Sequence, residues 1–244
     1  MRRTLILTGA SRGIGRALAL ELARSGYDLV LNARSEGPLR QVAEEVRALG
    51  VRAEAVAGSA GQAKVAQELV RKAEALGGFY GYIHNAGVLH PGPLVYELAE
   101  PLFLEVLEAN LIAGYQLARF AYPLLRPRGE GVVVYVGSGA AESNLPGIGA
   151  YAVAKAAEEH LAKQLAAEVP EITCFVYRPG VVETDMQRQA REAQGSAAPV
   201  LHQVFRGYKE EGLLLTPERA AEALVRLLQR PRQYHGRIVS WRDT

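Results

Sequence analysis

A tyrosine and a lysine four residues apart have the types and spacing that acid–base chemistry needs. Tyr151 and Lys155 stand side by side if residues 149–168 form a helix, because this spacing places two side chains on one helical face. An ammonium group favours ionisation of a neighbouring phenol, whose pKa is otherwise about 10. A phenol tuned toward neutrality can donate or accept a proton at working pH. Alternatively, the two residues are a half-exposed tyrosine and a surface lysine without a catalytic role.

A serine hydroxyl and a buried amide extend this candidate set. Ser138 lies thirteen residues before Tyr151, at the end of an apolar strand-like run, where its hydroxyl can hold a carbonyl oxygen beside the phenol. Asn110 falls within the apolar stripe of a helix expected over 99–126. A buried amide without hydrogen bonds costs about 1–3 kcal/mol. We therefore expect Asn110 either to distort the helix as a structural amide or to belong to a polar relay.

The elements that must position these residues alternate regularly between apolar runs and amphipathic patterns. Alternation of this kind predicts one α/β domain over 1–244, a Rossmann-type doubly wound parallel sheet of about seven strands with helices on both faces. Ligands then bind at the carboxyl ends of the strands. The stretch 185–215 is polar and glycine-punctuated, and is expected to be an irregular substrate loop or lid. The predicted strands are 4–8, 28–31, 51–56, 81–84, 131–136, 172–177 and 237–240, and the predicted helices are 13–25, 37–49, 61–76, 99–126, 149–168 and 217–230.

The first predicted strand runs directly into a glycine-rich turn that opens the first helix. Glycines at this junction permit a tight turn and a close approach of a pyrophosphate to the backbone. The helix N-terminus adds free N–H groups and a positive dipole. The alternative is a purely structural turn. The residues expected to contact the phosphates of a dinucleotide are Gly9, Ser11, Arg12, Gly13, Ile14 and Gly15.

The end of the second predicted strand favours NADP(H) over NAD(H). An NAD site needs a carboxylate there for the ribose 2′-hydroxyl, but the only nearby one, Asp28, lies at the opposite end of the strand. Arg34 follows the strand instead, and Arg12 can meet it across the ribose, as suits a 2′-phosphate. Alternatively both are solvated arginines, and Glu36 is close enough in sequence to pair with Arg34.

Two further turns follow predicted strands at the same edge of the sheet. Small residues after the fourth strand allow the backbone to lie against a cofactor ribose, and a Pro-Gly turn after the sixth can hold a nicotinamide carboxamide. His84 is interpreted as a histidine satisfied near the end of the sheet. No metal is expected, because His84 and His90 lack partners at ligand spacing. The expected cofactor contacts are Asn85, Ala86, Gly87, Pro179, Gly180, Val182 and Thr184.

The composition excludes several other classes of function. The chain has 244 residues, 49% of them hydrophobic and 22% charged, with a net charge of +2. This balance is typical of a globular protein and does not indicate nucleic acid or membrane as a partner. No apolar run reaches the roughly 18 residues that span a bilayer. The single cysteine, Cys174, excludes internal disulfides, indicates a reducing, cytoplasmic location and is expected in the core.

Together these motifs resemble the short-chain dehydrogenase/reductase superfamily over nearly the whole chain. The resemblance implies an NAD(P)(H)-dependent oxidoreductase that acts on carbonyls or alcohols. It implies that Tyr151 donates the proton in reduction and that Ser138 orients and polarises the carbonyl. It further implies that Lys155 tunes the phenol and holds the nicotinamide ribose, and that Asn110 keeps a water in a proton relay. The matching motifs are Thr8-Gly9-x-x-x-Gly13-x-Gly15, Asn85-Ala86-Gly87, Asn110, Ser138, Tyr151-x-x-x-Lys155 and Pro179-Gly180-x-x-x-Thr184.

A closer resemblance is to the sepiapterin reductase-like branch, whose members reduce pterin side-chain ketones or small diketones. It rests on residues 179–187, 190–192, 207–209, 216–218 and 235–241. Two positions depart from the family. No Asp follows the third strand, so adenine must be held by backbone or by Ser59. Ser240 stands where pterin reductases place a carboxylate, with Asp243 three residues later.

These observations predict an NADPH-dependent reductase of small-molecule carbonyls. An alcohol dehydrogenase or a β-ketoacyl-type reductase of the same superfamily is an alternative, and a non-catalytic NADP(H)-sensing regulator is a rival from another class. Small residues are frequent in 149–168 and allow close helix–helix approach. The resemblance implies that subunits pair through this helix and the one at 99–126, as a homodimer or homotetramer.

Overall fold

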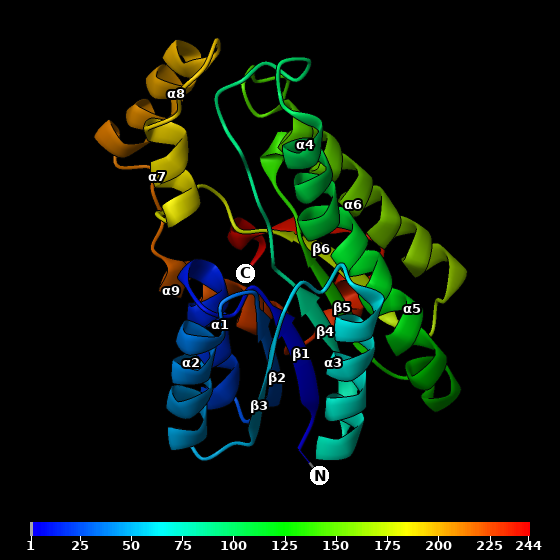
Figure 1. Cartoon of the computed structure of the whole chain (residues 1–244). Coiled ribbons are helices and arrows are strands. Elements are labelled where there is room, and N and C mark those ends of the chain that lie inside the picture. The colour runs from blue at the N-terminus through cyan, green and yellow to red at the C-terminus, as the bar shows by residue number, and fades with distance from the viewer. Residues whose placement is uncertain (1) are drawn as a thin grey trace.

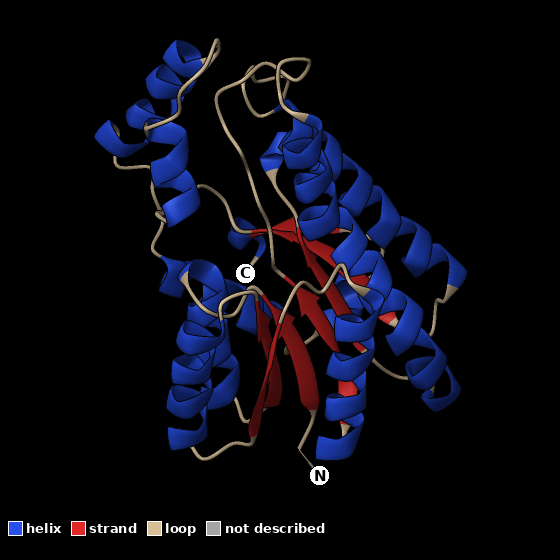
Figure 2. Ribbon diagram, in the orientation of Figure 1, coloured by secondary structure: helices blue, strands red, loops and turns tan. Residues whose placement is uncertain are grey.

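Seven parallel strands form one sheet in the order β3-β2-β1-β4-β5-β6-β7 (Figures 1 and 2). The computed structural model describes residues 2–244. The order reverses beside β1, as in a doubly wound fold, so the expected fold class is confirmed. Strand ends differ from the sequence prediction by one or two residues. The strands are β1 Thr4–Thr8, β2 Asp28–Ala33, β3 Ala53–Ala57, β4 Phe79–His84, β5 Val132–Val136, β6 Thr173–Arg178 and β7 Ile238–Ser240.

Helices cover both faces of the sheet, and others stand above its carboxyl edge (Figure 1). One face packs against α1 (Gly13–Arg24), α2 (Glu36–Ala48) and α9 (Pro217–Leu227). The opposite face packs against α3 (Ala63–Leu76), α5 (Ala113–Leu125) and α6 (Gly149–Glu168). The remaining elements are helix α8 (Ala198–Glu210), the shorter helices α4 (Glu100–Leu107) and α7 (Asp185–Arg191), a π-helical turn (Glu108–Ile112) and 3₁₀ turns at Arg126–Arg128, Gly139–Ala141, Pro231–Tyr234 and Trp241–Asp243.

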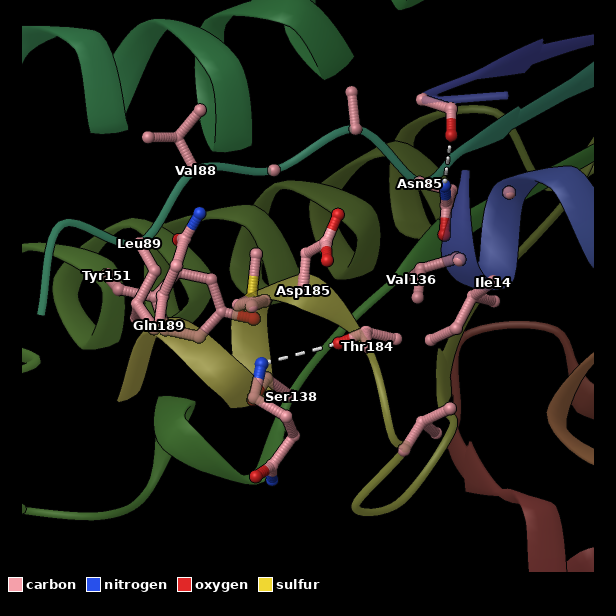
Figure 3. A pocket seen from close by; sticks show the side chains of 18 of the residues that line it. Ile14, Asn85, Val88, Leu89, Val136, Ser138, Tyr151, Thr184, Asp185 and Gln189 are labelled. Carbon is pink, nitrogen blue, oxygen red and sulfur yellow. Dashed lines mark hydrogen bonds between the residues drawn. The ribbon is translucent and has the colours of Figure 1, made fainter. Parts of the chain in front are cut away.

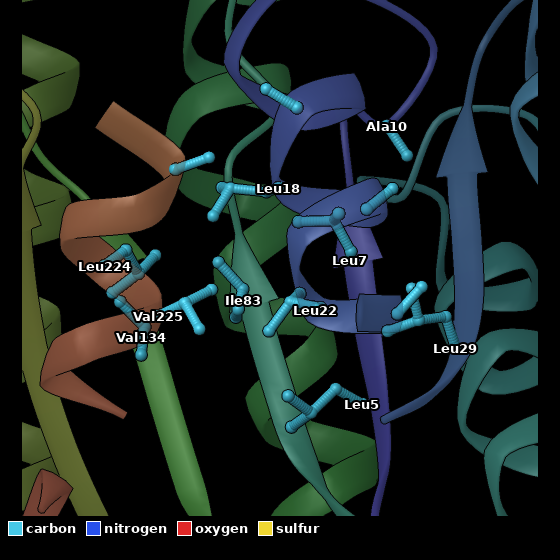
Figure 4. Packing of buried hydrophobic residues seen from close by; sticks show 14 of the residues in the cluster. Leu5, Leu7, Ala10, Leu18, Leu22, Leu29, Ile83, Val134, Leu224 and Val225 are labelled. Carbon is cyan, nitrogen blue, oxygen red and sulfur yellow. The ribbon is translucent and has the colours of Figure 1, made fainter. Parts of the chain in front are cut away.

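The central strands are buried on both sides, which explains why their sequences are continuous apolar runs. Leu5 and Leu7 point into the layer of α1, α2 and α9, whereas Ile6 points into the layer of α3, α5 and α6. Figure 4 shows Leu18 and Leu22 of α1 in the same cluster as Leu5 and Leu7 of β1. Each such side chain stabilises the fold by roughly 1.5–3 kcal/mol when fully buried. The strand ends that carry the turns are thereby held on a rigid frame.

The helix expected over 99–126 is interrupted by the π-helical turn at Glu108–Ile112. Asn110 lies in this turn and is fully buried. Its side-chain Nδ2 donates to the Val106 carbonyl at 2.8 Å. A regular α-helix reserves that carbonyl for the backbone N–H of residue 110, so the side chain displaces the backbone bond. The expected distortion of this helix by its amide is confirmed.

The expectation of an irregular stretch over 185–215 is wrong, because this segment contains α7 and α8. Thr184 caps α7 by accepting a hydrogen bond from the Gln187 backbone N–H. Pro199 lies in the first turn of α8, where proline is tolerated. Each helix buries only two residues, Gln187 and Ala190 on α7 and Ala198 and Leu201 on α8. Most side chains of both helices are exposed or only half-buried, which explains why the segment is polar in the sequence.

Two smaller expectations concern the core and the membrane. Cys174 is fully buried on β6, where its thiol donates to the Ala162 carbonyl, as expected for a core cysteine. Burial raises the pKa of this thiol to about 12, so it is not a reactive thiolate. None of the helices within 2–244 combines the length and the apolar character that crossing a membrane requires.

Candidate active site

A cleft of about 1700 Å³ opens along the carboxyl edge of the sheet (Figure 3). It exceeds the roughly 300–1,000 Å³ of most small-molecule pockets, so it has room for a dinucleotide and a second molecule. Every residue that the sequence assigned to cofactor or catalysis lines this cleft, except Asn110, which is buried behind it. Helices α7 and α8 form one wall, and α4 with the loop after β4 faces them (Figure 1).

The turn between β1 and α1 has the shape that a pyrophosphate needs. Gly9 has φ of +67°, and a Cβ built on it would lie 2.8 Å from Nδ2 of Asn85 and 2.9 Å from Cα of Ala86. A Cβ on Gly15 would collide with the Gly9 carbonyl oxygen. Within the described chain no side chain caps the start of α1, and its first turn contains no acidic residue. The free N–H groups and positive dipole of α1 therefore face the cleft and fit an anionic group.

The two arginines expected at a 2′-phosphate both lie at the mouth of the cleft and are both ion-paired. Arg12 Nη1 lies 3.0 Å from Asp185 Oδ2, at the start of α7. Arg34 pairs with Glu105 of α4. The alternative that Glu36 pairs with Arg34 is not realised, because Glu36 pairs with Arg40 one helical turn away. The side chains of Arg12 and Arg34 are 66% and 60% exposed, so an arriving anion can compete for them.

Glu105 has a second hydrogen-bond partner that the sequence prediction missed. His90 Nε2 lies 2.7 Å from Glu105 Oε2. The hydrogen bond from His90, with that from Arg34, holds the pKa of the Glu105 carboxyl below its usual range. His90 has φ of +47°, which is unusual for a residue other than glycine. The loop after β4 is thus held to α4 across the cleft mouth.

Tyr151 and Lys155 share one face of α6, as their spacing predicted. The Lys155 ammonium lies 5.8 Å from the centroid of the Tyr151 ring. It donates hydrogen bonds to the Val136 carbonyl at 2.8 Å and to Glu158 Oε2 at 2.7 Å. Ser138 follows β5, and its Oγ accepts a hydrogen bond from the Ala140 N–H at 3.2 Å. Its hydroxyl proton remains available for a carbonyl oxygen in the cleft.

Glu158 is a charged neighbour of this site that the sequence prediction missed. Its side chain is fully buried. Burial raises the pKa of Glu158 to about 7, although the nearby Lys155 ammonium opposes that shift. Burial acts to lower the pKa of Lys155, but the neighbouring Glu158, Tyr151 and Glu159 together offset it, so the pKa of the lysine is raised. The sequence did contain a signal for this ion pair, because an acidic residue three positions after a lysine lies on the same face of a helix.

A second buried carboxylate, Glu159, supports Ser138 from below. Its Oε1 accepts hydrogen bonds from the Ser138 N–H at 3.2 Å and from Arg178 Nε at 2.9 Å. Arg178 Nη2 lies 2.7 Å from Glu159 Oε2 and 2.8 Å from Glu142 Oε1. Hydrogen bonds to these two carboxylates raise the pKa of Arg178. The pair fixes the end of β5 to α6 and β6, which holds the serine backbone beside Tyr151.

Asn110 offers a buried acceptor to the back of the site. Its Nδ2 donates to the carbonyls of Val88 and Val106, both at 2.8 Å. Its Oδ1 accepts no hydrogen bond from residues 2–244, and a Cβ built on Gly87 would lie 2.7 Å from it. Ordered water usually satisfies acceptors of this kind. Asn110 therefore distorts its helix and also presents an acceptor that suits a polar relay.

The two family departures have structural counterparts at opposite ends of the cleft. Ser59, the side chain available for adenine, donates to Glu108 Oε1. Ser240 lines the cleft on β7, and both its N–H and its hydroxyl donate to Asp243 Oδ2, at 2.6 and 2.9 Å. The Asp243 carboxylate is thus used in a local capping box and does not replace a carboxylate at position 240.

Comparisons with known proteins agree on one group of relatives. The sequence profile of a family described as short chain dehydrogenase matches residues 3–195. An uncharacterized oxidoreductase of Saccharomyces cerevisiae is 32% identical over 250 residues, covering 100% of this chain and 97% of that protein. Sepiapterin reductase of Meriones unguiculatus is 33% identical over 252 residues, covering 98% of this chain and 95% of that protein. An alcohol dehydrogenase structure from the archaeon Thermococcus sibiricus, complexed with 5-hydroxy-NADP, is 29% identical with a TM-score of 0.82, covering 98% of this chain and 96% of that one.

Proposed function

Because the chain belongs to the short-chain dehydrogenase family, near its sepiapterin reductase-like branch, and is therefore an oxidoreductase, we propose that it reduces small-molecule ketones or diketones with NADPH. One observation carries the proposal. Ser138, Tyr151 and Lys155 line the same cleft as the uncapped, glycine-rich start of α1. A proton donor, a carbonyl-binding hydroxyl and a phosphate site therefore lie in one cavity.

The cleft residues fit a dinucleotide along its length. The turn at Gly9–Gly15 would hold the pyrophosphate, Arg12 and Arg34 the 2′-phosphate, and Lys155 the nicotinamide ribose. When bound, the nicotinamide of NADPH supplies a hydride to the carbonyl carbon. The archaeal relative's complex with an NADP derivative supports the choice of the phosphorylated cofactor. The missing carboxylate at the end of β2 supports it independently.

The protein's own part in reduction is to place and protonate the carbonyl. Ser138 donates its hydroxyl proton as a hydrogen bond to the carbonyl oxygen and so holds it beside Tyr151. Tyr151 donates its phenolic proton to that oxygen as the carbon is reduced, which yields the alcohol. The Lys155 ammonium, held by Val136 and Glu158, stabilises the phenolate that remains. The acceptor on Asn110 holds a water from which the phenolate is reprotonated by way of Lys155.

The opposite end of the cleft favours a small apolar or aromatic substrate. Its walls come from the loop after β4, the loop before α6, and helices α7 and α8. These walls include a group of apolar side chains, as is usual for small-molecule sites, with polar side chains of α7 beside them. No carboxylate replaces the missing pterin anchor at Ser240, so ketones and diketones fit better than pterins. The apolar and aromatic side chains of this wall are Leu89, Leu145, Ile148, Met186, Phe205 and Tyr208.

The test is oxidation of NADPH against diketones, quinones, pterins and β-ketoacyl thioesters. We expect turnover of at least one ketone, and Tyr151→Phe should lower kcat by about 10²–10⁴-fold because it removes the proton donor. NADPH binding, measured by fluorescence, should persist in this variant. Tyr96→Phe, at an 82% exposed position, is the matched control. Near-normal kcat in Tyr151→Phe would refute the assignment. NADPH binding without turnover of any compound would favour a regulator.

A further inference from the structure

A buried chain of hydrogen bonds begins at the loop after β4, which lines the cofactor cleft. The backbone N–H groups of Asn85 and Ala86 both donate to Thr8 Oγ1, each at 3.1 Å. A hydroxyl oxygen that accepts two hydrogen bonds must use its own proton as a donor elsewhere. Thr8 Oγ1 lies 2.9 Å from His84 Nδ1, so the hydroxyl donates to that nitrogen. The neutral His84 ring therefore carries its proton on Nε2.

The protonated nitrogen of His84 faces the catalytic helix. Nε2 lies 3.3 Å from the Asn110 carbonyl oxygen and 3.5 Å from Glu158 Oε1. Burial, with the charge of Lys155, lowers the pKa of His84 to about 3, so the ring stays neutral. The other oxygen of Glu158 accepts the hydrogen bond from Lys155 at 2.7 Å. Glu158 thus stands between the catalytic lysine and the sheet.

We propose that Glu158 is a positioning residue of this active site, which fixes the Lys155 ammonium from beneath and, as a carboxylate, reduces the positive charge that acts on Tyr151. The proposal rests on the proposed reductase function. A fully buried carboxylate is costly, and Oε1 of Glu158 makes no hydrogen bond with the described residues. A neutral side chain at this place would avoid the cost of burying a carboxylate but would leave the buried Lys155 ammonium without its ion-pair partner. The carboxylate is therefore placed here to hold the lysine.

The charge of Glu158 acts on a small and defined neighbourhood. Its protonation leaves the Lys155 ammonium without a counterion, so the full positive charge of the ammonium acts on the neighbouring Tyr151 ring. Glu159 adds a like charge that favours the protonated form of Glu158. The titratable groups around it are Lys155, Glu159 and Tyr151 on α6, His84 on β4 and Tyr135 on β5.

The test compares Glu158→Gln with wild type across pH 5–9. The pH at which reductive kcat falls should be lower in Glu158→Gln than in wild type, on the order of one pH unit, because the substitution removes the negative charge that offsets the Lys155 ammonium. Glu158→Asp keeps the charge but draws it away from Lys155, so it should lower kcat and leave the pH of the fall near that of wild type. Asp28→Asn is the matched control, because it removes a fully buried carboxylate paired with Arg52 at the far end of β2. This variant should leave the pH at which kcat falls unchanged.

A second measurement does not depend on activity. The pKa of Glu158 is raised above its ordinary value of 4.5 to about 7, so the folded state prefers the protonated form. The contribution of Glu158 to the free energy of unfolding is therefore fully present below pH 4.5 and is lost as the pH rises through 7. The Tm of wild type should therefore fall relative to that of Glu158→Gln between pH 5 and pH 8. Parallel Tm curves, or a pH–rate profile in Glu158→Gln that matches wild type, would overturn the proposal. Absence of wild-type turnover with intact Tm behaviour would instead refute the reductase function.

Discussion

Charged pairs occur both at the mouth of the cleft and beneath the proposed catalytic residues, in very different surroundings. At the mouth, the cationic members of Arg12–Asp185 and Arg34–Glu105 are more than half exposed. Beneath the site, Lys155–Glu158 and Arg178–Glu159 bury their carboxylates almost completely. Exposed pairs contribute roughly 0–1 kcal/mol and are screened by salt, whereas breaking a buried pair costs about 3–5 kcal/mol.

Under the proposed function, the difference separates the part of the cleft that binds the cofactor from the part that carries out the reaction. A cofactor phosphate can displace Asp185 or Glu105 from an arginine at little cost, because both partners are accessible to water. The buried pairs do not exchange in this way, so they hold Ser138 and Lys155 in fixed positions against Tyr151. One end of the cleft is thus built to change partners on binding, and the other to remain rigid during reaction.

The largest expected effect comes from breaking a buried pair. Glu159→Ala should lower the free energy of unfolding by about 3 kcal/mol, because it leaves the mostly buried Arg178 with only an exposed partner and the Ser138 N–H without an acceptor. Urea denaturation measures this. Glu171→Ala, which removes the exposed partner of Arg126, should cost less than about 1 kcal/mol. Equal losses in the two variants would show that burial does not distinguish these pairs.

A smaller effect is expected where a pair exchanges partners. Arg34→Ala should weaken NADPH binding about 10- to 100-fold, as expected for loss of a charge-assisted hydrogen bond, and should change NADH binding little. Titration calorimetry with both cofactors measures the ratio. Arg40→Ala removes an exposed, paired arginine from the neighbouring helix and is the control. If NADPH and NADH lose affinity equally, the 2′-phosphate role of Arg34 is wrong.

The smallest expected effect is a gain in NADPH affinity, in contrast to the loss expected for Arg34→Ala. Glu105→Gln frees Arg34 from its competing carboxylate, so NADPH should bind about two- to fivefold more tightly at low salt. The gain should shrink as salt is raised, because the exposed pair is screened. Glu36→Gln, which frees Arg40 instead, should leave the affinity unchanged. Weaker NADPH binding in Glu105→Gln would indicate that Glu105 orders Arg34 for the phosphate and does not compete with it.

Much of the frame was predictable because it depends on short-range patterns. Apolar runs buried on both faces mark parallel strands, and the glycine turn requires backbone geometry that only glycine adopts without a collision. The spacing of Tyr151 and Lys155 is a property of one helix. Helices α7 and α8 were missed because their segment is polar and punctuated by glycine, and Glu105 was not foreseen as the partner of Arg34 because it is 71 residues away.

By itself the sequence determined the doubly wound sheet, the phosphate turn and the pairing of a phenol with an ammonium on α6, since each follows from periodicity or from neighbours within one helical turn. Only the tertiary structure decided which charges surround that pair. Glu158 is three residues from Lys155, yet its burial and its contact with His84 depend on how α6 packs against β4. Charge effects depend on burial and on distances between distant segments, and these exist only once the chain has folded.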